Sequence, residues 1–133
     1  MKEITVITKN EIGALAEVCS ILGKAGINLQ GISANGVDNK GIIKIITSDP
    51  ISSENFLNKK GYKTKINDVI VAKINDRPGE LSKLIEKLSR ERVNLESVYL
   101  LNNTKGIVEI AIIPERTEDI EKITDMIGKG YIA

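Results

Sequence analysis

The chain has 133 residues, of which 41% are hydrophobic and 28% are charged, a composition typical of soluble globular domains. Its 19 basic and 18 acidic residues give a net charge of +1, which leaves no broad positive field to hold a nucleic acid. Histidine is absent and cysteine occurs once, so the commonest general base and the thiolate clusters that hold metals are missing. We therefore expect no enzyme activity, no metal, no cofactor and no nucleic acid partner.

The sequence also favours one compartment. No apolar run approaches the roughly 20 residues of a membrane-spanning helix, and the first residues, Met1–Ile4, do not resemble a secretory signal. Cys19 has no second cysteine with which to form an internal disulfide, which favours a reducing environment. We expect a cytoplasmic protein that does not contact membranes.

The first half of the chain predicts six elements. β-Branched and apolar residues predict strands, and the spacing i, i+3, i+4, i+7 predicts an amphipathic helix with a stripe of Leu15, Val18, Cys19 and Leu22. In chain order, we expect a strand over 4–8, a helix to about residue 25, strands over 28–34 and 42–47, a helix that begins at a Ser52–Ser53 cap, and a strand over 62–66. Turns rich in Asn, Asp and Gly are expected over 10–13 and 35–41.

The second half repeats the first. Gly13-Ala14-Leu15 aligns with Gly79-Glu80-Leu81, and at the same offset Ile27-Asn28-Leu29 aligns with Val93-Asn94-Leu95. In chain order, we expect a strand over 69–74, a helix to about residue 92, strands over 95–101 and 107–113 joined by a loop over 102–106, a helix that begins at Thr117, and a strand over 131–133. The chain therefore consists of two copies of one unit, 1–67 and 68–133.

The order strand, helix, strand, strand, helix, strand implies an α+β fold of two ferredoxin-like βαββαβ units, each an antiparallel sheet with helices on one face. A sheet order of 4-1-3-2 leaves the second strand of each unit at an edge, which pairing with another chain would cover. We therefore expect a homodimer. The short link at Asn67-Asp68 allows two arrangements: either strand 62–66 moves beside strand 69–74, or residues 62–74 run on as one bent strand.

Two motifs resemble the signature of ACT domains. Asn10-Glu11-Ile12-Gly13-Ala14-Leu15 is followed by Ala25-Gly26-Ile27-Asn28-Leu29, and Asp76-Arg77-Pro78-Gly79-Glu80-Leu81 is followed by Val93-Asn94-Leu95-Glu96. The first motif has Ile12 where the family usually has proline, so the second motif matches better. The resemblance covers nearly the whole chain, as a tandem of two ACT units with no enzyme attached.

The resemblance implies a regulatory module of amino-acid metabolism that binds a small molecule, most often an amino acid, at the junction between two units. It places the ligand at the turn after the first strand, at the beginning of the first helix and at the opening of the second strand. The implied contacts are Asn10, Glu11, Ile12, Gly13, Ala14, Leu15, Asn28, Asp76, Arg77, Pro78, Gly79, Glu80, Leu81 and Asn94. Because the second motif is fuller, we expect Gly79 to matter more for binding than Gly13.

The chemistry of the turn suits an amino acid. Glycine lets a ligand approach the backbone, the free N–H groups of a helix N-terminus suit a carboxylate, and Asn10 or Asp76 suits an ammonium group. The same residues also have purely structural interpretations. The glycines suit a tight turn, Asn10 and Asp76 are typical helix caps, and Asn28 and Asn94 suit Asx turns.

Two functions stay open on this basis. The first is a module that binds an amino acid and signals to a separate enzyme or regulator. The second is a protein-interaction or oligomerisation module that has kept the fold and no longer binds a ligand. An acyl-phosphate-cleaving enzyme is disfavoured, because neither repeat has a glycine-rich loop that would cradle a phosphate.

Overall fold

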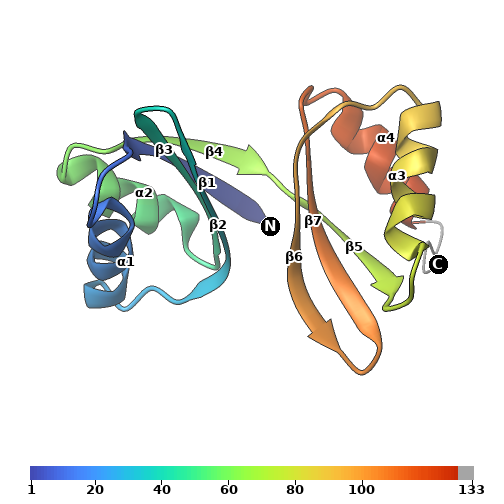
Figure 1. Cartoon of the computed structure of the whole chain (residues 1–133), viewed down its shortest axis with the longest axis horizontal. Helices are drawn as coiled ribbons and strands as arrows, with labels where there is room; N and C mark the ends of the chain where they lie inside the picture. Colours follow the sequence, from blue (N-terminus) through green and yellow to red (C-terminus); the bar gives the residue numbers. More distant parts are fainter. Residues whose placement is uncertain (129–133) are drawn as a thin grey trace. The chain divides into compact units, whose positions relative to one another are not determined.

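The computed structural model describes residues 1–128. It divides into two compact units, one of residues 1–67 and one that begins at Asp68. Figure 1 shows that each unit combines a sheet with helices. No helix of this described part is long and apolar enough to cross a membrane.

The first unit is a four-stranded sheet with both helices on one face (Figure 1). Its elements are β1 (Lys2–Lys9), α1 (Ala14–Lys24), β2 (Leu29–Val37), β3 (Lys40–Thr47), α2 (Pro50–Lys59) and β4 (Lys63–Asp68). The sheet order is β2-β3-β1-β4, and both β1 and β2 pair antiparallel with β3. This is the order that the sequence predicts, and it leaves β2 at an edge.

The core of the first unit follows two periodicities. Alternate strand residues such as Ile4 in β1 and Ile45 in β3 point to one face of the sheet, where they meet Val18 and Leu22 from successive turns of α1. These four side chains are completely buried, as is Leu57 of α2. They hold both helices on the sheet.

The predicted stripe of α1 is only partly buried. Leu15 is 42% exposed and Cys19 is half-buried, whereas the stripe predicts both in the core. Leu15 lies in the first turn of the helix, beside a surface pocket. Helical periodicity identifies the face that turns inward, but the sheet covers only part of the length of that face.

The described part of the second unit has a three-stranded sheet. Its elements are β5 (Ile70–Asn75), α3 (Glu80–Arg90), β6 (Leu95–Thr104), β7 (Ile107–Pro114) and α4 (Asp119–Gly128). β7 lies between β5 and β6 and pairs antiparallel with both. The predicted last strand, Tyr131–Ala133, lies outside the described residues.

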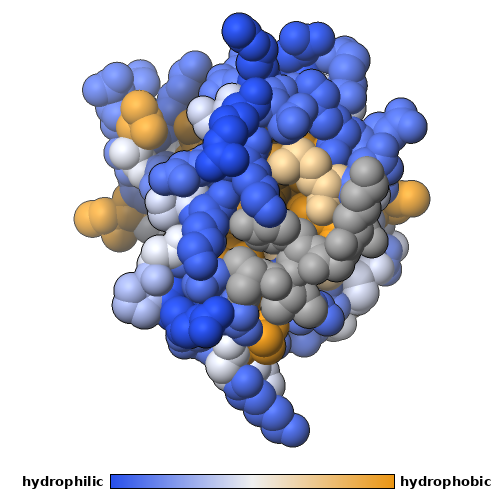
Figure 2. Space-filling view, turned by 90° about the vertical axis from the view of Figure 1, so that its right-hand side faces the viewer, coloured by the Kyte–Doolittle hydropathy of each residue, from blue (hydrophilic) through white to orange (hydrophobic). Residues whose placement is uncertain are grey.

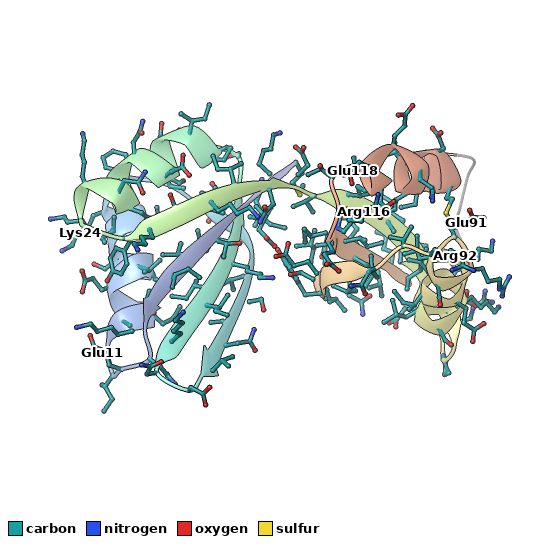
Figure 3. All side chains as sticks on the ribbon, turned by 90° about the horizontal axis from the view of Figure 1, so that it is seen from above. Glu11, Lys24, Glu91, Arg92, Arg116 and Glu118 are labelled. Atoms are coloured by element: carbon teal, nitrogen blue, oxygen red, sulfur yellow. The ribbon has the colours of Figure 1, made fainter. Side chains whose placement is uncertain are left out.

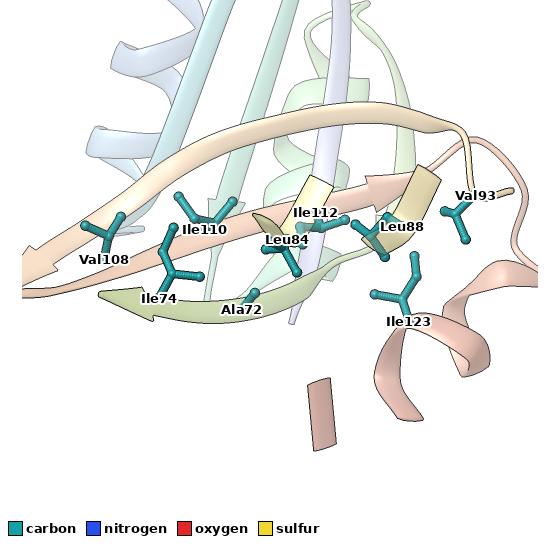
Figure 4. Close-up of a cluster of buried hydrophobic side chains, with 9 residues drawn as sticks. All are labelled: Ala72, Ile74, Leu84, Leu88, Val93, Val108, Ile110, Ile112 and Ile123. Atoms are coloured by element: carbon teal, nitrogen blue, oxygen red, sulfur yellow. The ribbon is translucent and has the colours of Figure 1, made fainter. Parts of the chain in front are cut away.

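The second core lies between this sheet and its two helices. Figure 4 shows Leu84 and Leu88 of α3 and Ile123 of α4 gathered around strand residues such as Ile112. The other side of α3 is polar and exposed, with Glu86 and Arg90 among its residues. Figure 2, viewed from the side on which Figure 1 draws α3, accordingly shows a mainly hydrophilic surface.

These observations confirm the predicted fold class, a tandem of ferredoxin-like α+β units. The strand exchange considered from the sequence is wrong, because β4 lies beside β1 in the first sheet. Only Val69 separates β4 from β5, which agrees with the alternative of a continuous extended segment.

Two helices begin at other residues than the sequence predicts. α2 begins at Pro50, because the side chain of Asp49 accepts a hydrogen bond from the Ser52 N–H at 3.2 Å and proline suits the first helical position. The predicted Ser52–Ser53 cap is therefore wrong. α4 begins at Asp119, and Thr117 belongs to the preceding turn, where its carbonyl oxygen accepts from the Ile120 N–H at 3.2 Å.

Both hairpins are tighter than predicted. The loops expected over 35–41 and 102–106 shrink to turns of two residues, 38–39 and 105–106, between the end of one strand and the beginning of the next. Backbone pairing continues through the polar residues as far as the pairs Val37–Lys40 and Thr104–Ile107. Polar side chains mark a hairpin, but the pairing of its backbone does not depend on them.

Candidate functional site

Each unit begins its first helix with a glycine in a left-handed conformation. Gly13 is the N-cap of α1 with φ 90°, and Gly79 is the N-cap of α3 with φ 87°. Residues with a Cβ rarely adopt this conformation. A Cβ at either position would meet no atom within 4 Å, so the need for glycine is conformational and does not come from crowding.

Asn10 and Asp76 connect each turn to the neighbouring hairpin. Asn10 Nδ2 donates to the carbonyl oxygen of Asp38 at 2.9 Å, and the carboxylate of Asp76 accepts from Asn103 Nδ2 at 2.9 Å. The N-cap positions of α1 and α3 are taken by Gly13 and Gly79, so the interpretation of Asn10 and Asp76 as helix caps is wrong. Their contact with an ammonium group stays a prediction.

A pocket of 680 Å³ lies on one flank of the turn over residues 10–13, which joins β1 to α1 and is called the first turn below. Four of the predicted contacts line it: Glu11, Ile12, Gly13 and Ala14. Glu17 of α1 and Tyr62, which precedes β4, contribute to its wall. In Figure 3, Glu11 lies at the turn, beside the beginning of α1.

This pocket carries charges of both signs. Glu11 and Glu17 supply carboxylates, while Lys9 and Lys63 supply ammonium groups. The pKa of the Tyr62 hydroxyl is raised, first by burial, then by a hydrogen bond to Glu17 and by the negative charges of Glu17 and Glu11. Carboxylates and ammonium groups thus line one pocket, which suits a ligand that also carries both charges.

A smaller pocket, of 170 Å³, lies on the opposite flank of the same turn, toward the β2–β3 hairpin. Among its lining residues are Asn10, Glu11, Ala14 and Leu15. The six contiguous predicted contacts of the first unit, 10–15, thus all line one pocket or the other. Leu15 and its counterpart Leu81 are exposed to nearly the same extent, 42% and 41%.

The corresponding turn of the second unit, over residues 76–79 and called the second turn below, is followed by a buried carboxylate. The side chain of Glu80 is only 5% exposed, and its Oε1 lies 3.2 Å from Arg77 Nη2 and 3.4 Å from Lys83 Nζ. Its Oε2 is buried without a hydrogen-bond partner. Such groups are rare in folded proteins, because a buried oxygen that loses water and gains no donor is costly.

Asn28 and Asn94 are not brought to the turn of their own unit. In the second unit, Asn94 precedes Leu95, which pairs with Pro114 at the end of β7, whereas the turn follows Asn75, which pairs with Ile107 at its beginning. The length of β7 separates the two positions by about 20–25 Å, at ~3.4 Å per residue. The register of the first unit places Asn28 in the same way, before Leu29, which pairs with Thr47. Within one unit, the predicted contacts therefore do not form one site.

The sequence reasoning missed Glu17 and Tyr62. Glu17 lies three residues after Ala14 on α1, a spacing that places both on one side of the helix and could have identified it. Tyr62 reaches the turn only because β4 pairs beside β1, and no local pattern indicates that contact. Within residues 1–128, no group of three or more Cys, Asp or Glu side chains is placed to hold a metal ion.

Several solved structures resemble the chain. A protein from Bacteroides thetaiotaomicron shares 27% identity, with a TM-score of 0.82 over 94% of this chain and 86% of that one. The ligand-free regulatory subunit of aspartate kinase from Thermus thermophilus shares 15% identity, with a TM-score of 0.68 over 98% of this chain and 91% of that one. Its counterpart from Thermus flavus shares 17%, with a TM-score of 0.66 over 96% and 90%.

The sequence comparisons differ in outcome. A search of curated proteins finds no match. A family model described as an ACT domain pair matches residues 1–130. Because this match spans almost the whole chain, the protein belongs to the ACT domain family and is a pair of ACT domains.

Proposed function

We propose that the protein is a regulatory module that binds an amino acid and reports it to a separate enzyme or regulator, with no catalysis of its own. The observation that carries this proposal is the pocket of 680 Å³ at the first turn, lined by the predicted contacts Glu11, Ile12, Gly13 and Ala14. Its volume falls within the range of small-molecule sites. The position of the ligand at a junction between ACT units stays a prediction.

The charges of the pocket support a zwitterionic ligand. An α-amino acid carries an ammonium group and a carboxylate a few bonds apart. Glu11 and Glu17 suit the first, and Lys63 together with the free N–H groups of the first turn of α1 suits the second. The regulatory subunits of aspartate kinase that share the fold support the regulatory part of the proposal.

A thermal-shift screen of the twenty common amino acids tests this function. An amino acid at 100 times its Kd should add about 2.7 kcal/mol to the free energy of unfolding, which raises the Tm by several degrees. If no amino acid raises the Tm and calorimetry detects no heat of binding, the interaction module without a ligand becomes the better interpretation.

We also expect a homodimer. β2 and β6 are edge strands of their sheets, and both expose large apolar side chains, with Ile32 45% and Leu100 57% exposed. Pairing with a second chain would cover such an edge. Light scattering should therefore give twice the chain mass of 14.5 kDa, and the mass of a single chain would contradict this expectation.

A further inference from the structure

The second unit holds a carboxylate between two cations at its turn. Oε1 of Glu80 contacts Arg77, three residues before it, and Lys83, three residues after it, at 3.2 and 3.4 Å. The side chain is 95% buried, and its Oε2 lacks any hydrogen-bond partner. The two cations therefore satisfy only one of the two carboxylate oxygens, and a buried polar atom without a partner calls for an explanation.

The first unit has the opposite charges at two of the same three positions and an uncharged alanine at the third. The internal repeat aligns Arg77, Glu80 and Lys83 with Glu11, Ala14 and Glu17. The backbones of the two turns match, since Gly13 has φ 90° and ψ −10° and Gly79 has φ 87° and ψ −11°. An alanine thus stands where the second unit has its carboxylate, between two glutamates in place of two cations.

The place left open by Ala14 belongs to the pocket of 680 Å³. Glu11, Ala14 and Glu17 all line it. Tyr62 lines it as well, and the pKa of its hydroxyl is raised by burial and then by Glu17 and Glu11. Lys9 and Lys63 also line it, so the pocket keeps partners for an anionic group beside the two glutamates.

We propose that the two turns are not equivalent: the first binds the ligand by its ammonium group, between Glu11 and Glu17, and Glu80 closes the second by filling the corresponding place with the chain's own carboxylate. This inference rests on the proposed function and adds to it the number of sites and the ligand group that is recognised. The ligand therefore carries a free amino group, and each chain binds one ligand molecule at these two turns. The carboxylate of Glu80, held by Arg77 and Lys83, occupies the position that the ligand takes in the first unit.

Exchanging the two sets of three residues tests the proposal by calorimetry on the full chain, with the amino acid that gives the largest thermal shift as probe. The wild type is expected to bind one equivalent. The variant Arg77→Glu/Glu80→Ala/Lys83→Glu opens the second turn and is expected to bind two. The variant Glu11→Arg/Ala14→Glu/Glu17→Lys closes the first turn and is expected to bind none, with an unchanged circular dichroism spectrum.

The outcomes separate this inference from the proposed function. One equivalent for both the wild type and the opened variant overturns the inference and leaves amino-acid binding intact. No binding by the wild type but one equivalent for the opened variant supports the closure by Glu80 and contradicts the site in the first unit. If neither binds, both fail.

The N-acetyl derivative of the same amino acid tests the ammonium group without any triple variant. Acetylation removes the positive charge, so its Kd for the wild type is expected to rise at least about tenfold. Glu17→Gln should weaken the binding of the free amino acid and leave the binding of the N-acetyl derivative unchanged. Equal binding of the two compounds by the wild type would overturn the proposed recognition of the amine.

Discussion

Replacing Leu88 by alanine is expected to lower the free energy of unfolding by about 2–5 kcal/mol, measured by urea denaturation. Leu88 is completely buried and packs from α3 into the core of the second unit (Figure 4). Alanine removes apolar contacts and leaves a cavity that the neighbouring strands can close only in part. Because whole domains are stable by only about 5–15 kcal/mol, the change should be plain in the unfolding midpoint.

Leu81→Ala is the matched control for this substitution. It makes the same chemical change on the same helix, but Leu81 is 41% exposed, so its truncation removes less buried surface. We expect a loss below about 1 kcal/mol. Equal losses for the two variants would contradict the assignment of Leu88 to the core and of Leu81 to the surface.

The fold could be predicted because the local periodicity of apolar residues identifies most of its core. Apolar residues such as Ile4 occur at alternate positions of the strands, and apolar residues such as Val18 and Leu22 are one turn apart on the helix. The second half repeats both patterns. The boundaries that were wrong depend on single contacts. The hydrogen bond from the Ser52 N–H to Asp49 sets the beginning of α2, and apolar periodicity carries no information about it.

Of the candidate site, only the contiguous part could be predicted from the sequence. Residues 10–15 line the pockets of the first turn, and a single motif identifies them. Tyr62 joins them through the pairing of a distant strand, and Asn28 is placed at the other end of the sheet by the register of β2 and β3. A motif identifies residues that share a signature, whereas the pairing of strands decides which of them meet.

The sequence also left the burial of Glu80 unpredicted. A charged residue after a glycine at a helix start suggests a solvated first turn. The cations three residues before and three residues after Glu80 lie on its side of the helix, and only in the structure does the carboxylate prove to be enclosed between them. The motif alone ranks the second turn above the first for binding, whereas the proposed closure by Glu80 predicts the reverse order.

Replacing Gly13 by valine is expected to weaken amino-acid binding at least about tenfold, a loss of about 1.4 kcal/mol, while Gly79→Val leaves the Kd nearly unchanged. Gly13 has φ 90°, and a side chain with a Cβ is strained there by about 1–2 kcal/mol. The turn relaxes toward another conformation, which moves Glu11 relative to Glu17 across the pocket. Calorimetry gives the Kd, and urea denaturation gives the accompanying loss of stability.

Gly79→Val is the matched control, because it separates strain from ligand contact. Gly79 has φ 87°, and a Cβ there meets no more atoms than one at Gly13, so both variants should lose a similar amount of stability. Only a turn that holds the ligand also loses affinity. Gly13→Asn should recover much of the binding, because asparagine tolerates the left-handed conformation. A larger loss of affinity for Gly79→Val than for Gly13→Val would place the ligand at the second turn, as the fuller motif suggests, and would contradict its closure by Glu80.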